Sequence, residues 1–118
     1  MFQLDYKSGV SICDQIVSGV IRLKALSILP AGSQLPSVRA LALQLSVNPN
    51  TIQKAYSLLE SKGIVYSVKG KGSFISDDAA AEQAVLQKAT ERFTEAVKAA
   101  RELGLTDQQL IDIVKGVE

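Results

Sequence analysis

The chain has 118 residues, of which 47% are hydrophobic and 21% are charged, and its formal net charge is +1. This length allows one compact domain with an appendage and excludes a catalytic barrel or a doubly wound nucleotide-binding fold. The sequence has no histidine and one cysteine, which excludes imidazole catalysis, histidine-ligated metals and an internal disulfide. No apolar run approaches the roughly 20 residues of a membrane helix, and no signal peptide opens the chain, so we expect a cytoplasmic protein without a membrane contact.

Charge is distributed unevenly along the chain. Residues 1–77 carry a net charge of +4 and residues 78–118 a net charge of −3. A basic first part joined to an acidic tail is a weak indication of nucleic-acid binding by the first part. Two ordinary solvated surfaces explain the same charges equally well.

The first half of the chain predicts three helices. The first covers residues 11–26, and its apolar side chains repeat at the spacing of one helical face. Ser37 is a good N-cap for a short second helix that ends near residue 45. After a tight turn, Asn48 can cap a third helix that continues to about residue 62, where Gly63 is a natural stop. The apolar face of the first helix comprises Ile12, Ile16, Val20 and Leu23.

The hydrophobic period changes after the third helix. Residues 64–76 are rich in β-forming side chains and are interrupted by Lys69-Gly70-Lys71-Gly72, which predicts a β-hairpin with a basic tip. From residue 78 the chain is alanine-rich, and we expect a helix over residues 80–103. A last helix is expected over residues 106–117, because Thr106 and Gln109 have the spacing of a capping box.

Each of the two tail helices has an apolar stripe. Both stripes cannot be buried within an appendage of about 40 residues, so a second copy of the chain is the simplest partner. An effector could also bind between protomers near Phe93, but the tail has little room for a closed pocket of the roughly 300 Å³ that ligand sites need, which favours a dimer core. The expected dimerisation residues are Val85, Ala89, Phe93, Val97, Ala100, Leu103, Leu110, Ile113, Val114 and Val117.

The order of elements predicts a winged helix-turn-helix. Two short helices joined by a tight turn and followed by a strand pair are typical of this architecture. The expected fold is therefore mainly α with a small β-hairpin wing (α+β). We expect a DNA-binding domain at residues 1–77 and a two-helix dimerisation tail, with a possible effector role, at residues 78–118.

Polar side chains near the second helix of the pair and in the wing are the candidate contacts with double-stranded DNA. Asn and Gln pair with adenine, Thr contacts a base or a methyl group, and glycines let a backbone approach phosphate. Each has a simpler explanation as a cap or a solvated residue; Asn48 fits a cap better than a base reader, and Arg39 could equally be a surface residue. The candidates are Ser37, Arg39, Asn48, Asn50, Thr51, Gln53, Lys54, Lys69, Gly70, Lys71 and Gly72.

The sequence offers no constellation for catalysis, and we expect no enzyme, metal or cofactor. Cys13 lies beside an apolar stripe, which favours a small buried hydrophobe over a redox sensor. The glycines of residues 69–72 lack the spacing of a P-loop. Asp77 and Asp78 lie at a junction, where capping of the first tail helix explains them.

Residues 35–75 contain four motifs in register: Leu-Pro-Ser-x-Arg-x-Leu-Ala from Leu35, Val-Asn-Pro-Asn-Thr from Val47, Ala-Tyr-x-x-Leu-Glu-x-x-Gly from Ala55, and Gly-x-Gly-Ser-Phe from Gly70. With these motifs the segment resembles the DNA-binding domain of the GntR family of bacterial transcriptional regulators. The family often has tyrosine at the position of Cys13 and glycine at that of Ser27. The short two-helix tail and the Asn-Pro-Asn-Thr turn resemble the YtrA subfamily.

The resemblance implies a homodimeric DNA-binding regulator, usually a repressor and often of a transporter operon, on a pseudo-palindromic operator. It implies a phosphate or base contact for Arg39, recognition-helix contacts for Asn48, Asn50, Thr51 and Gln53, and minor-groove contacts for Lys69 and Gly70. Other subfamilies have arginine at the positions of Pro49 and Gln53, so their guanine contacts do not transfer. The alternative is a winged-helix protein-interaction module. For such a module we would expect an exposed apolar patch on the second helix of the pair, at about residues 48–62, and on the wing.

Overall fold

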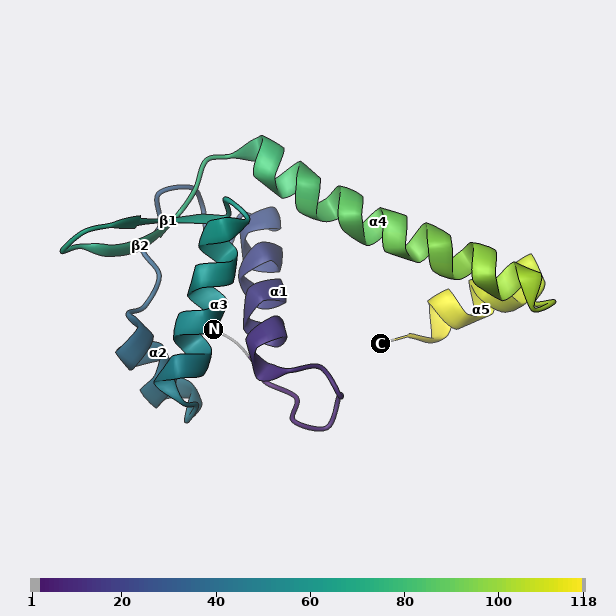
Figure 1. Cartoon of the computed structure of the whole chain (residues 1–118), viewed down its shortest axis with the longest axis horizontal. Coiled ribbons are helices and arrows are strands. Elements are labelled where there is room, and N and C mark those ends of the chain that lie inside the picture. Colours follow the sequence, from purple (N-terminus) through teal and green to yellow (C-terminus); the bar gives the residue numbers. More distant parts are fainter. Residues whose placement is uncertain (1–2, 118) are drawn as a thin grey trace. The chain divides into compact units, whose positions relative to one another are not determined.

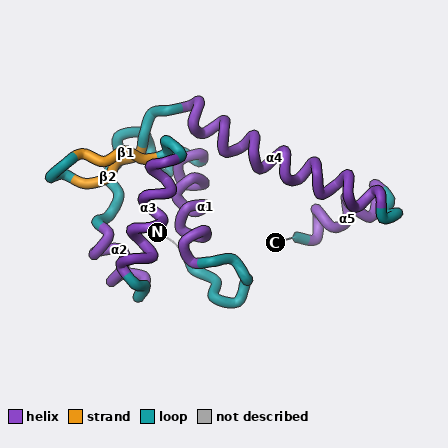
Figure 2. Tube along the Cα trace, in the orientation of Figure 1, coloured by secondary structure: helices purple, strands orange, loops and turns teal. Residues whose placement is uncertain are grey.

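The computed structural model describes residues 3–117, which form two compact units that meet between Glu82 and Gln83. We call residues 3–82 the head and residues 83–117 the tail. The predicted winged-helix order is confirmed, with every helix boundary within one residue of expectation (Figures 1 and 2). The elements are α1 (Ile12–Ala25), α2 (Val38–Leu45), α3 (Pro49–Ser61), β1 (Val65–Val68), β2 (Gly72–Ile75), α4 (Ala79–Glu102) and α5 (Asp107–Gly116).

The helices of the head begin at the polar caps that the sequence predicts. The Ser37 hydroxyl oxygen accepts a hydrogen bond from the backbone N–H of Ala40 at 3.0 Å, and the Asn48 side chain accepts one from that of Asn50 at 2.8 Å. Such caps satisfy N–H groups that have no partner inside the helix. After the end of α1, Ser27 has a φ of 58°. This left-handed conformation favours glycine, which the resembling family often has at this position.

The core of the head lies between α1 and α3, which run side by side, with α2 packed on α3 (Figure 1). Helix α3 buries one apolar face, formed by Ile52, Ala55, Tyr56 and Leu59. The buried face of α1 is displaced from the expected one, because Cys13 and Val17 are buried whereas Ile12 and Leu23 are only half-buried. The buried core comprises Cys13, Ile16, Val17, Val20, Leu35, Leu41, Ala42, Ile52, Ala55, Tyr56, Leu59, Ile64, Val65 and Ile75.

The hairpin is antiparallel, with Val65 opposite Ile75 and Val68 opposite Gly72. The segment before α2 lies in extended form along the other edge of β2. The N–H of Leu35 donates to the carbonyl of Ser73 at 2.9 Å, and the N–H of Ile75 donates to the carbonyl of Ser33 at 2.8 Å. This segment satisfies backbone groups that an isolated two-stranded hairpin leaves open at its edge.

The first turn of α4 belongs to the head. The Asp78 carboxylate accepts a hydrogen bond from the N–H of Ala81 at 3.0 Å, which is the expected capping role. Lys24 at the end of α1 forms an ion pair with Glu82 at 3.0 Å. The compact head therefore continues to residue 82, beyond the expected boundary at residue 77.

The tail consists of α5 and of the part of α4 that follows Glu82. Thr106 and Gln109 form the predicted capping box at the start of α5. None of the described residues of either helix is buried. No helix within residues 3–117 has the length and apolar character needed to cross a membrane.

Candidate nucleic-acid interface

Helices α2 and α3 are joined by a tight turn in which Ser46 adopts the left-handed conformation, with a φ of 54°. After this turn Asn48 caps α3, and Asn50 and Gln53 are exposed within its first turns. The structure thus gives Asn48 the capping role that the sequence favoured. The exposed amide groups of Asn50 and Gln53 can donate and accept hydrogen bonds in the way that base edges require.

Tyr56 holds α3 to the segment that precedes α2. Its hydroxyl donates a hydrogen bond to the backbone carbonyl of Pro36 at 2.7 Å, and its ring is buried in the core. Burial raises the pKa of Tyr56 to about 12, because the charged phenolate would lose its hydration. A core residue therefore sets the position of the helix that carries Asn50 and Gln53.

The exposed surface of α3 has two flanks with different neighbours. On one flank, Gln53 and Glu60 line a hollow of about 460 Å³ together with residues of the wing, among them Ser67 and Lys71. Lys54 lies on the other flank, toward α1, where its positive charge acts on Cys13. The sequence-predicted set on α3 is therefore divided, and Gln53, rather than Lys54, is grouped with the wing.

Cys13 is the buried small hydrophobe that the sequence indicated. Burial raises the pKa of its thiol, and this effect outweighs the opposing influence of Lys54. A thiol held in its neutral form is a poor nucleophile and a poor metal ligand. Within residues 3–117, no group of three or more cysteine, aspartate or glutamate side chains is arranged to hold a metal ion.

Arg39 is exposed on α2 and lies close to the beginning of α3. Together with Leu43, Ser46 and Pro49 it lines a second hollow, of about 470 Å³. The guanidinium is therefore carried beside the turn of the helix pair. Ser37, by contrast, uses its hydroxyl oxygen to cap α2.

The wing presents its basic residues at the tip of the hairpin. Lys69, Gly70, Lys71 and Gly72 are all exposed, and Gly70 has a φ of 77°, as this tight turn requires. Among the described residues, the ion pairs are Lys24–Glu82, Lys98–Glu95 and Arg101–Asp107. The lysines of the tip and Arg39 therefore form no ion pair with a carboxylate of the described residues.

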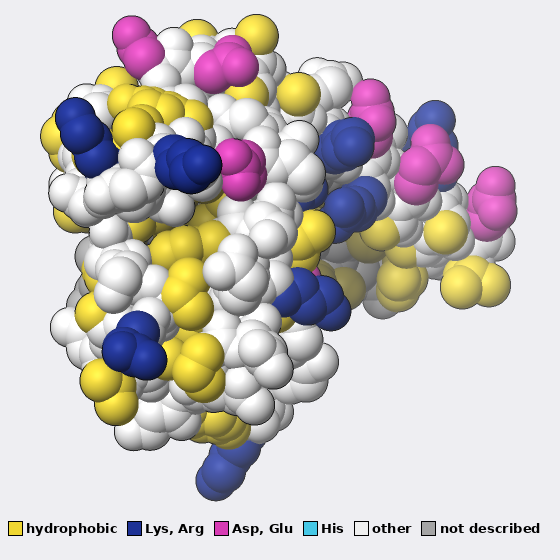
Figure 3. All heavy atoms as spheres, turned by 60° about the vertical axis from the view of Figure 1, so that its left-hand side comes forward, with side chains coloured by type: hydrophobic (Ala, Val, Ile, Leu, Met, Phe, Trp, Pro, Cys, Tyr) yellow, Lys and Arg dark blue, Asp and Glu magenta, His cyan; other side chains and the backbone are white. Residues whose placement is uncertain are grey.

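The face that carries the wing is shown in Figure 3. Lys and Arg side chains are scattered across it, with hydrophobic side chains exposed between them and a few carboxylates near the top. The exposed apolar side chains of the hairpin are those of Tyr66 and Val68, on the strand and not on the tip. The exposed residues of the first turns of α3 are Pro49 and the polar Asn50, Gln53 and Lys54, and Pro49 lines a hollow with the exposed Leu43 of α2.

Two residues of this region were not among the sequence candidates. The side-chain amide of Gln34 donates a hydrogen bond to the carbonyl of Lys71 at 2.7 Å, although 37 positions separate them. Glu60 places a carboxylate in the hollow between α3 and the wing. Glu60 belongs to the Leu-Glu pair of a recognised motif, whereas no local signal marks Gln34, whose contact exists only after the hairpin has folded.

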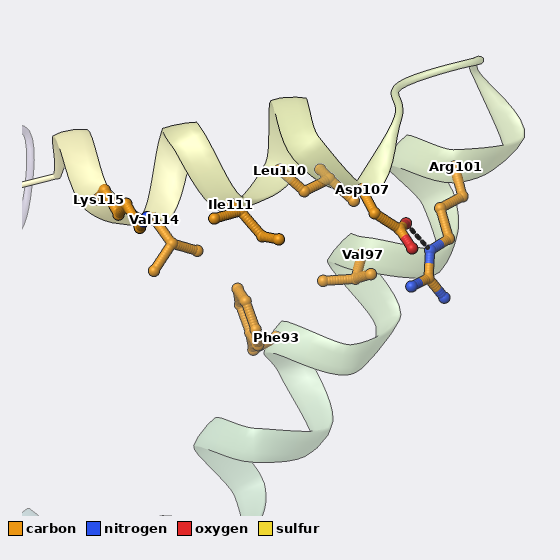
Figure 4. A pocket seen from close by; sticks show the side chains of 8 residues that line it. All are labelled: Phe93, Val97, Arg101, Asp107, Leu110, Ile111, Val114 and Lys115. Atoms are coloured by element: carbon orange, nitrogen blue, oxygen red, sulfur yellow. Dashed lines mark hydrogen bonds and ion pairs between the residues drawn. The ribbon is translucent and has the colours of Figure 1, made fainter.

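The tail contains an open apolar groove of about 370 Å³ between α4 and α5 (Figure 4). Phe93 and Val97 on α4 point toward Ile111 and Leu110 on α5. Four expected dimerisation residues line this groove: Phe93, Val97, Leu110 and Val114. Ile111 also lines it and was not expected, and the remaining six are not among its lining residues: Val85, Ala89, Ala100, Leu103, Ile113 and Val117.

Charged groups lie at both ends of the groove, with Lys115 at one end and an ion pair at the other (Figure 4). Arg101 and Asp107 are 2.9 Å apart and join the end of α4 to the start of α5. The groove has the volume of a ligand site, but it is open to solvent in a single chain and is not the closed pocket for which the sequence indicated little room.

Known proteins resemble both the sequence and the fold. Residues 13–75 match the family described as bacterial regulatory proteins, gntR family. The uncharacterized HTH-type transcriptional regulator YhcF of Bacillus subtilis is 40% identical over 115 residues, which are 97% of this chain and 92% of that protein. The HTH-type transcriptional repressor YtrA of the same species is 42% identical over 79 residues, which are 67% of this chain and 61% of that protein.

A solved structure extends the likeness through the tail. The GntR family transcriptional regulator from Listeria monocytogenes superposes with a TM-score of 0.75 at 33% sequence identity, over 96% of this chain and all of that one. Transcriptional regulators of this family therefore share the fold in which the turn, the capped α3 and the basic wing occur. Such regulators are not enzymes. This chain belongs to the GntR family of bacterial regulatory proteins and is a transcriptional regulator with a winged-helix DNA-binding domain.

Proposed function

We propose that the chain acts as a homodimeric repressor that binds a pseudo-palindromic operator through α3 and the wing. The observation that carries this proposal is that cations without an ion pair among the described residues are grouped with exposed amides. Arg39 lies beside the start of α3, Asn50 and Gln53 are exposed on its first turns, and Lys69 and Lys71 are exposed at the wing tip. Phosphates would bind the cations, and base edges would bind the amides.

The roles of the candidate residues follow from their positions. Gln53 and Asn50 would read bases in the major groove, with Thr51 beside them, while Asn48 and Ser37 serve chiefly as caps. Arg39, Lys69 and Lys71 would neutralise phosphates, and Gly70 and Gly72 would let the wing backbone approach the minor groove. Lys54 would contact the phosphate backbone from the flank of α3 that faces α1.

The dimer is supported by the exposure of the tail. Phe93 is 58% exposed and Val114 55% exposed in a single chain, and none of the described residues of α4 or α5 is buried. Contiguous apolar surface of this kind on a soluble chain marks an interface. A second copy would bury the groove between α4 and α5 around a twofold axis. We therefore assign the groove to the partner copy and not to a small-molecule effector.

A twofold dimer has a direct consequence for the operator. Two copies of α3 would enter successive major grooves about 34 Å apart, so the half-sites should form an inverted repeat. Repression would follow from occupation of a promoter by this dimer. The relative YtrA is named a transcriptional repressor. The family resemblance further implies that the target is a transporter operon and that the protein acts in the cytoplasm.

The test has two parts that use the full chain. Sedimentation equilibrium measures whether the chain is a dimer, and selection from a random duplex library at physiological salt measures whether it prefers a sequence. An inverted repeat bound by a dimer supports the proposal. A monomer, or a dimer that enriches no motif, overturns it and favours the protein-interaction module.

A further inference from the structure

We infer that Gln34 is a positioning residue for DNA binding: its side-chain amide holds the wing tip in place. This inference rests on the proposed function and adds a residue outside the expected DNA contacts. Gln34 is neither in a helix nor in the hairpin, and it stands just before the Leu-Pro-Ser segment that begins α2.

The backbone around Gln34 is attached to β2 on both sides. Gln34 is bridged to Phe74, Leu35 donates to the carbonyl of Ser73 at 2.9 Å, and the carbonyl of Ser33 accepts from Ile75 at 2.8 Å. From this anchored position the side-chain Nε2 donates to the carbonyl of Lys71 at 2.7 Å. The contact thus joins a fixed segment of the head to the turn of the hairpin.

Gly72 provides the space that this contact needs. A Cβ atom built at Gly72 would lie 2.9 Å from Nε2 of Gln34, and Gly72 has a φ of 126°. Any other residue would therefore displace the amide and would also strain the backbone. The φ of Gly72 is what excludes other residues there, and the close approach of the Gln34 amide shows that a Cβ at this position would displace the contact.

The tip would otherwise depend on the hairpin alone. The hairpin has two strands of four residues, and Lys71 closes its turn by donating to Val68 at 2.9 Å. So short a two-stranded ribbon is marginally stable by itself. The bond from Gln34 reduces the freedom that Lys69 and Lys71 must lose on reaching phosphate, which improves affinity without a direct contact.

The test compares Gln34→Met with the wild-type full chain on its selected operator. Methionine keeps the length and removes the donor without adding charge, and Gln87→Met makes the same exchange on the exposed surface of α4 as the matched control. We expect Gln34→Met to weaken operator binding about two- to tenfold, the usual range for one lost hydrogen bond, while Gln87→Met binds like wild type.

A double-mutant cycle separates positioning from direct contact. If Gln34 acts through the tip, its substitution has little effect once both tip lysines are methionine. An equal loss in the two backgrounds means that Gln34 contacts DNA itself and overturns the inference. Backbone ¹⁵N order parameters in the free protein provide a readout without DNA: residues 69–71 should become more mobile in Gln34→Met than in wild type.

The outcomes distinguish this inference from the proposed function. A wild-type chain that enriches no operator contradicts the proposed function, whereas unchanged order parameters at residues 69–71 contradict the inference alone. Unchanged operator affinity in Gln34→Met also contradicts it.

Discussion

Lys24 at the end of α1 and Glu82 in the first turn of α4 form an ion pair, with 3.0 Å between Nζ and Oε2 and with only 9% of the Lys24 side chain exposed. The pair fastens the start of the long helix to the head. A charge that is largely removed from water depends on its partner, so the loss of either member is unfavourable.

Glu82→Gln should therefore lower the free energy of unfolding. We expect a loss of about 1–2 kcal/mol, less than for a fully buried pair because Glu82 keeps part of its hydration. Urea unfolding measures the change, and Glu95→Gln, in the exposed pair with Lys98, is the matched control that should leave stability unchanged. Equal effects of the two substitutions would show that the Lys24 pair is an ordinary surface contact.

The raised pKa of Tyr56 predicts that the protein loses stability at alkaline pH. In the unfolded chain a tyrosine ionises near its usual pKa of about 10, whereas burial raises the pKa of Tyr56 to about 12. Between these values the unfolded state releases a proton that the folded state retains, so stability present below pH 10 falls as the pH rises toward 12. Tyr56→Phe should weaken this dependence in urea unfolding series at several pH values. A parallel pH profile in the variant would contradict the assignment.

Substitutions of Asn48 and Asn50 should affect different properties, although the residues are only two positions apart: the first should lower stability and the second should lower base discrimination. Asn48→Ala removes the N-cap of α3 and should cost about 1 kcal/mol of stability. Asn50→Ala keeps the cap and should leave the thermal midpoint unchanged, while operator discrimination falls by about 1–3 kcal/mol at one base pair. Thermal unfolding and competition binding measure the two effects. If Asn48→Ala lost base discrimination and Asn50→Ala did not, the base contact would have to be assigned to Asn48.

The salt dependence of binding reports the number of phosphates that the chain neutralises. Four phosphates per protomer, bound through Arg39, Lys54, Lys69 and Lys71, give the dimer a slope of log K against log salt near −7. Substitution of Lys69 and Lys71 by methionine should make the slope shallower by about 3 to 4. A nearly salt-independent wild-type curve would refute phosphate neutralisation as the main source of affinity.

The groove between α4 and α5 should control dimerisation. Phe93→Glu removes the ring from the apolar part of the groove and puts a carboxylate in its place, and it should convert the dimer to a monomer in sedimentation equilibrium, because burying that charge costs more than an ion pair with Lys115 or Arg101 returns. Thr94→Glu adds the same group at the next position, which does not line the groove, and should remain dimeric. A dimeric Phe93→Glu variant would place the interface elsewhere on the chain.

The sequence alone determined the helices, the caps and the hairpin, because these depend on local interactions. Apolar spacing, Ser37, Asn48 and the Thr106–Gln109 box set helix limits through contacts within a few residues, and the wing glycines set the turn. The motif from Leu35 to Phe74 carried the family assignment for the same reason. It consists of side chains whose spacing is fixed along the chain.

Only the tertiary structure decided which distant residues meet. The bond from Gln34 to Lys71, the ion pair of Lys24 with Glu82 and the position of Lys54 toward α1 arise from the packing of separate elements. The buried face of α1 also differed from its apolar stripe, because Cys13 and Val17 meet the core while Ile12 is partly exposed. Periodicity shows that a helix has an apolar side, but its packing partners select the residues that lose their contact with water.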